Sequence, residues 1–68
     1  MNNAKAAAIA ASAYNVCGPR TGTPATPATV GGFNRTEVLR CIGLYMAAHD
    51  GSLFSRDEIV EARELLAA

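Results

Sequence analysis

Apolar residues recur at helical spacing in three stretches of the chain. The first stretch, from about residue 4 to 16, consists largely of alanine, the strongest helix former. The second runs from about residue 35 to 49, and the third runs from Arg56 nearly to the end. The pattern predicts an all-α protein in one small domain, with an N-terminal helix in residues 1–17, a linker in 18–32 and a helical hairpin in 33–68.

The apolar stripe of the first predicted helix is made mainly of small side chains, with Asn2 or Asn3 as the expected N-cap. Alanine lets another backbone approach closely, although each alanine buries little area. Such a face is suited to packing against a partner helix, either in this chain or in a second copy. The stripe consists of Ala6, Ile9, Ala10, Ala13, Val16 and Cys17.

Gly18 and Pro19 end the first helix and open a stretch that is rich in glycine, proline and threonine. Its Thr-Pro steps favour extended geometry, because a residue that precedes proline is disfavoured in the helical region. Val30 is its only large apolar side chain. We interpret residues 18–32 as a linker or an exposed arm, and prefer a plain linker to a docking peptide or a phosphorylation site.

Two similar phrases, FNRTEV at residues 33–38 and FSRDEI at residues 54–59, mark the starts of the other two helices. Each phrase has the pattern of a capping box with a hydrophobic staple. Asn34 and Ser55 are the expected N-caps, with Glu37 and Glu58 at the third helical positions. Asp50-Gly51 is expected to end the second helix, so the two helices form an antiparallel or angled hairpin.

The facing stripes of the hairpin predict a thin core. Cys41, Leu44 and Val60 are apolar but lie off these stripes, so we expect the first helix or another chain to cover them. The stripes comprise Val38, Leu39, Ile42, Tyr45, Met46, Ile59, Ala62, Leu65 and Leu66.

The chain has 68 residues and a formal net charge of zero, so its stability is marginal and no strong overall field attracts nucleic acid or anionic lipid. The charge is unevenly placed, with a balance of +3 over residues 1–48 and −3 over residues 49–68. The N-terminal stretch lacks the large apolar residues of a signal peptide, and it is too short and polar to span a bilayer. We expect a soluble cytoplasmic protein.

The residues that could carry out catalysis or bind metal form no complete site in the sequence. His49 next to Asp50 could act as a general base. However, no further group is placed to complete a site, and a cation at a helix C-terminus is favoured in any case. Read as a calcium loop around Gly51, the segment has Met46 and Ala48 where oxygen ligands are needed.

The two cysteines, Cys17 and Cys41, lack the paired spacing of a structural zinc site, which usually has four ligands. We expect both thiols to be reduced, with Cys41 the slower to react, and treat a disulfide between them as the less favoured alternative. The sequence thus predicts no enzyme, no cofactor and no metal.

The absence of a catalytic pattern, the thin core and the split charge favour a small protein-binding module. We expect an inhibitor or adaptor of a larger complex, of the kind that phages and mobile elements encode, with a protein partner or self-association and no small-molecule substrate. The alternatives are a structural subunit of a homo-oligomer and a DNA-binding helix-turn-helix accessory protein, although acidic side chains on the third helix disfavour DNA. The predicted partner-binding residues are Ile9, Ala13, Val16, Arg35, Arg40, Leu44, Val60, Glu61 and Glu64.

Overall fold

The computed structural model of the chain describes residues 1–19, 22–48 and 53–68, and it confirms the all-α prediction. Its elements in chain order are α1 (Asn3–Cys17), the short 3-10 helix η1 (Val30–Gly32), α2 (Arg35–Ala48) and α3 (Arg56–Ala67). The observed helices begin within about one residue of the predicted starts. The predicted end of the second helix at residues 49–51 lies outside the described residues.

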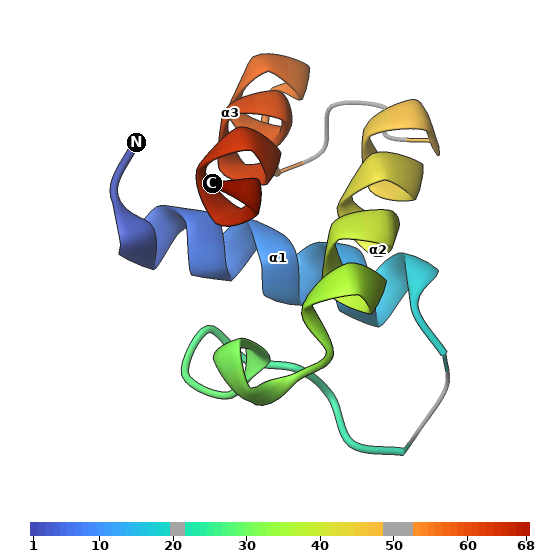
Figure 1. Cartoon of the computed structure of the whole chain (residues 1–68). Coiled ribbons are helices and arrows are strands. Elements are labelled where there is room, and N and C mark those ends of the chain that lie inside the picture. The colour runs from blue at the N-terminus through green and yellow to red at the C-terminus, as the bar shows by residue number, and fades with distance from the viewer. Residues whose placement is uncertain (20–21, 49–52) are drawn as a thin grey trace.

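The three long helices all pack on one another, with α1 in the centre. In Figure 1, α1 (blue) runs across the molecule, α3 (red) lies against one side of it, and the green segment of residues 22–33 loops past the other side. Because α1 contacts α2, α3 and η1, it joins the hairpin to the loop.

Each end of α1 is fixed by a specific local contact. Asn2 Oδ1 accepts a hydrogen bond of 2.8 Å from the backbone N–H of Lys5, which confirms an asparagine N-cap. At the other end the Gly18 N–H donates to the Tyr14 carbonyl at 2.8 Å. A Cβ on Gly18 would lie 2.4 Å from that carbonyl oxygen, so the hydrogen-bonded turn that ends α1 requires glycine here, and the same Cβ would lie 3.3 Å from Cys41 Sγ of α2.

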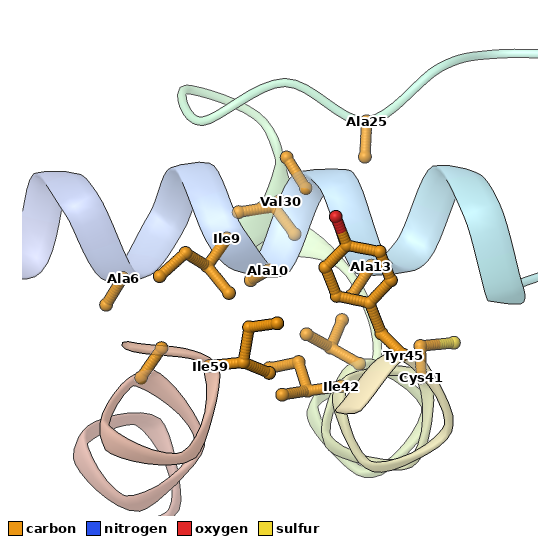
Figure 2. Packing of buried hydrophobic residues seen from close by; sticks show 13 residues of the cluster. Ala6, Ile9, Ala10, Ala13, Ala25, Val30, Cys41, Ile42, Tyr45 and Ile59 are labelled. Atoms are coloured by element: carbon orange, nitrogen blue, oxygen red, sulfur yellow. The ribbon is translucent and has the colours of Figure 1, made fainter. Parts of the chain in front are cut away.

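The core is built on the small side chains of α1. Ile9 is the one large side chain that α1 contributes to the core. Figure 2 shows Ile9 near Ile59 and Ile42, on the side of α1 where the other two helices lie. Alanines let these helices approach closely, which explains how so small a chain encloses a core. The buried residues are Ala6, Ile9, Ala10, Ala11 and Ala13 of α1, Ala25 and Val30 of the loop, Val38, Cys41, Ile42 and Tyr45 of α2, and Ile59 and Ala62 of α3.

The segment between α1 and α2 is folded against α1 over its described part, in contrast to the exposed arm considered above. Ala25 and Val30 are buried, and Figure 2 shows Ala25 on the side of α1 opposite Ile42 and Ile59. The Asn15 side chain holds the loop, since its Nδ2 donates to the Ala25 carbonyl at 2.8 Å and its Oδ1 accepts from the Ala25 N–H at 2.7 Å. This amide pairs with the backbone as a neighbouring strand would, so the backbone can pack without losing hydrogen bonds.

Both predicted N-caps of the hairpin are confirmed. Ser55 Oγ accepts from the Glu58 N–H at 3.2 Å, and the Glu58 carboxylate accepts from the Ser55 N–H at 2.9 Å, which completes a capping box. Asn34 Oδ1 accepts from the Glu37 N–H at 3.0 Å at the start of α2.

The apolar residues that lay off the predicted hairpin stripes differ in their burial. Cys41 is fully buried, Val60 is half-buried, and Leu44 remains 45% exposed. We expected either the first helix or another chain to cover these residues. Helix α1 covers Cys41, but it leaves Leu44 exposed.

Candidate partner-binding groove

An apolar groove of about 300 Å³ lies where the loop, α1 and the start of α2 meet the end of α3. Its walls come from four parts of the chain, and Arg35 is its one charged lining residue among those that the structure describes. The groove is lined by Ala7, Ala10, Pro27, Ala28, Val30, Gly31, Phe33, Arg35, Val38, Leu39 and Leu66.

The walls of the groove are positioned by packing on α1. The Phe33 ring meets the Tyr14 ring edge to face, with centroids 4.7 Å apart and planes at 68°. This contact fixes the chain just before α2, so that Val38 and Leu39 in the first turns of α2 reach the groove. The short helix η1 contributes Val30, which is buried, to the lining of the groove.

Arg35 ties the start of α2 to the end of α3. Its Nη2 donates to the Leu66 carbonyl at 2.5 Å and to the Ala68 carbonyl at 2.8 Å. The last carbonyl groups of a helix have no partner within the helix and carry the negative end of its dipole, so a guanidinium is favourable there. The side chain is nevertheless exposed, and its charge lies beside the apolar lining.

Two carboxylates of the hairpin, those of Glu37 and Glu58, form ion pairs on the surface. Arg40 Nη2 lies 2.5 Å from Glu37 Oε1, and this hydrogen bond lowers the pKa of Glu37 and raises the pKa of Arg40. Glu58 pairs with Lys5 of α1, and the Lys5 hydrogen bond is the main reason that the pKa of Glu58 is lowered, with the Ser55 N–H adding to it. Both carboxyl groups are therefore held in their charged form.

Two of the predicted partner-binding residues are in the core. Ile9 and Ala13 have no exposed surface, because α1 uses this stripe to pack against the other helices of the same chain. The predicted symmetric pairing of two first helices through this stripe would require the core to open. Their burial follows from the central position of α1.

The remaining predicted residues are scattered, and only Arg35 lies at the groove. Val16 is 69% exposed at the end of α1. Glu61 of α3 receives the N-terminal amino group of Met1 at 2.9 Å. The other four, Arg40, Leu44, Val60 and Glu64, are exposed or half-buried on α2 and α3 and do not line the groove.

Sequence reasoning missed the groove because its lining residues were assigned to other roles. Val38, Leu39 and Leu66 were expected in the hairpin core, and Phe33 was expected to fold over the first turn of α2. Val30 gave the one available signal, since it is the only large apolar residue between 18 and 32.

Other parts of the described structure offer less for binding or chemistry. A hollow of about 490 Å³ lies along Tyr14–Pro24, where residues 20–21 are not described. No three or more His, Cys, Asp and Glu side chains among residues 1–19, 22–48 and 53–68 are grouped so as to hold a metal ion. His49 and Asp50, considered above as a catalytic pair, lie outside these ranges. None of the described helices is long and apolar enough to cross a membrane.

Comparison of the chain with protein-family models, with curated proteins and with solved structures finds no match.

Proposed function

We propose that this chain is a small non-enzymatic protein-binding module, which acts as an inhibitor or adaptor on a larger protein complex. In this proposal the apolar groove receives apolar side chains from a segment of the partner protein. The observation that supports it is a concave surface with apolar walls from all three helices and the loop, beside a single exposed guanidinium.

The dimensions of the groove suit a peptide segment. A volume of about 300 Å³ is at the small end for ligand pockets and accommodates roughly two large apolar side chains. An amphipathic helix presents its apolar anchors three or four residues apart, which fits a groove of this size. The Arg35 guanidinium already binds main-chain carbonyl oxygens through Nη2, and its other N–H groups are suited to an oxygen of the partner.

Surface charge favours protein over DNA as the partner. The outer face of α3 exposes Asp57, Glu61 and Glu64, which would repel phosphate groups if α3 were a recognition helix. On α2 the charge of Arg40 is balanced by its pair with Glu37. A protein segment with apolar anchors is compatible with this surface.

Two adjacent glycines provide a matched test of the groove. Gly31 lines the groove and Gly32 does not, and a Cβ on either residue would meet nothing within 4 Å. Gly31→Leu should fill part of the groove and leave the fold intact, whereas Gly32→Leu adds the same side chain next to it. A displayed library of random peptides, selected on the wild-type chain, would supply the probes.

We expect the selected peptides to carry two large apolar residues spaced three or four apart. Their affinity should fall by at least about tenfold on Gly31→Leu and stay within about twofold on Gly32→Leu, since one blocked apolar contact costs on the order of 1.4 kcal/mol or more. Titration of each peptide by fluorescence anisotropy measures this difference. Equal binding to both variants, or no enrichment over an unrelated helical bait, would contradict the proposal.

A further inference from the structure

The two cysteines of the chain lie on neighbouring helices at one end of the core. Cys17 is the last residue of α1, and Cys41 is in the second turn of α2. Cys41 is fully buried, while Cys17 is half-buried and packs against the same apolar cluster. Figure 2 shows the Cys41 side chain on α2 near the C-terminal part of α1. Both thiols are free in this structure.

The backbone that follows Cys17 comes into contact distance of the Cys41 sulfur. A Cβ on Gly18 would lie 3.3 Å from Cys41 Sγ. Since adjacent Cα atoms are about 3.8 Å apart, this sulfur is at most roughly 9 Å from the Cα of Cys17. The last turn of a helix is its most easily displaced part, so a local shift of Cys17 can bring the two sulfurs together.

The electrostatics of Cys41 agree with this proximity. Burial is the main cause that raises the pKa of the Cys41 thiol, and a negative charge on Cys17 raises the pKa further. Cys41 therefore stays protonated and shielded, while the half-buried Cys17 is the thiol that solutes reach first.

We propose that Cys17 and Cys41 are an oxidative modification site, at which a hydroperoxide converts the two thiols into a disulfide that fixes α1 to α2. The site is independent of the groove and of the proposed function.

The reaction proceeds in two balanced steps. Cys17 first loses its thiol proton. The thiolate attacks one oxygen of hydrogen peroxide, the O–O bond breaks, and the departing hydroxide combines with the released proton, which gives water and a sulfenic acid. The Cys41 thiol then attacks the sulfenic sulfur, and its proton leaves with the hydroxyl group as a second water. The two sulfurs lose two electrons and the peroxide gains them. Cys41 never has to meet the peroxide, which is consistent with its burial.

Mass spectrometry of the peroxide-treated full chain tests the proposal. The expected product is a monomer lighter by two hydrogens than the reduced chain, and its Tm should rise by on the order of 10 °C, because the bond restrains the unfolded chain. Trypsin cuts after Arg20 and Arg40, so the two cysteines fall in separate peptides that only the disulfide would join.

A neighbouring position on α1 provides the control. Val16 is 69% exposed, and the double variant Val16→Cys with Cys17→Ser moves the sulfur by one residue and turns it toward solvent. This variant should form no intramolecular disulfide under conditions in which the wild-type chain is fully converted. Equal conversion of both chains would overturn the proposal, because it would show bond formation from an unfolded state. A wild-type product consisting of disulfide-linked dimers, or of over-oxidised Cys17, would also overturn it.

Discussion

Helices α1 and α3 contribute to the same core in opposite ways. Helix α1 buries five of its 15 residues and has Ile9 as its only large buried side chain, whereas α3 has 12 residues and buries only Ile59 and Ala62. At its start, α1 has a single asparagine cap, while α3 has a complete capping box and two acidic residues in its first turn. Helix α1 is favoured by the high helix propensity of its alanines, whereas α3 depends more on its capping hydrogen bonds and on the buried side chain of Ile59.

The comparison of α1 with α3 shows that a small side chain can matter as much for the fold as a large one. The alanines of α1 contribute little area each, yet they allow contact with both the hairpin and the loop. The larger apolar residues of α3 are partly on the surface, since Leu65 is 38% exposed. Perturbing α1 should therefore have the greater effect, and four predictions test this, in order of decreasing effect.

The largest effect is expected for a charge at the centre of α1. Ile9→Asp places a carboxylate where no surface is exposed, and this should cost more than about 4 kcal/mol, which approaches the whole stability of a small domain. Far-ultraviolet circular dichroism should show loss of helix at 25 °C. Val16→Asp, on the exposed side of the same helix, should remain folded with a Tm within a few degrees of wild type. A folded Ile9→Asp chain would contradict the inference that α1 is at the centre of the core.

The second prediction concerns the small size of the α1 side chains. Ala13→Leu adds volume at a fully buried position, and overpacking of this kind costs typically about 1–3 kcal/mol. Ala4→Leu adds the same volume at an exposed position of α1 and should change stability by less than about 0.5 kcal/mol. Urea denaturation of both variants measures the difference. If Ala13→Leu is as stable as Ala4→Leu, close approach of the helices to α1 is not needed.

The helix starts could be predicted from the sequence because they depend on contacts between residues three apart. Ser55 with Glu58 and Asn34 with Glu37 form hydrogen bonds that the local pattern specifies. The position of α1 could not be predicted in the same way. Periodicity shows which face of a helix is apolar, but it does not show which elements cover that face.

The loop and the groove depend on contacts that local patterns do not contain. The Asn15 amide binds the backbone of a residue ten positions away, and Arg35 reaches the carbonyls at the end of α3. Arg35 was identified as a candidate from its charge, while the apolar lining was hidden among residues that resemble ordinary core positions. The groove exists only once the loop has packed on α1.

The third prediction compares the two helix caps. Ser55→Ala removes the oxygen that accepts the Glu58 N–H, and α3 should lose about 1 kcal/mol of stability. Asn2→Ala removes the corresponding bond of α1, where the loss should be smaller, roughly 0.5 kcal/mol, because alanines already favour the helix. Thermal melts of the two single variants make the comparison. A larger loss for Asn2→Ala would reverse the proposed difference between the helices.

The smallest effect is expected from the ion pair that joins the two helices. Lys5 of α1 pairs with Glu58 of α3, and this hydrogen bond, together with that from Ser55, lowers the pKa of Glu58 below its ordinary value of 4.5. A group with a lowered folded pKa stabilises the fold fully above its unfolded pKa, and the contribution disappears as the pH falls through the lower folded pKa. The Tm should therefore decline below about pH 4.5, and the decline should be smaller in Glu58→Gln, which lacks the titrating group.

Glu64→Gln, on the exposed surface of α3, is the matched control and should follow the wild-type curve. Because the pair is on the surface, the difference in acid-induced Tm decline between Glu58→Gln and Glu64→Gln should also shrink in 1 M salt. Parallel acid profiles for Glu58→Gln and wild type would show that the Lys5–Glu58 pair contributes nothing to stability.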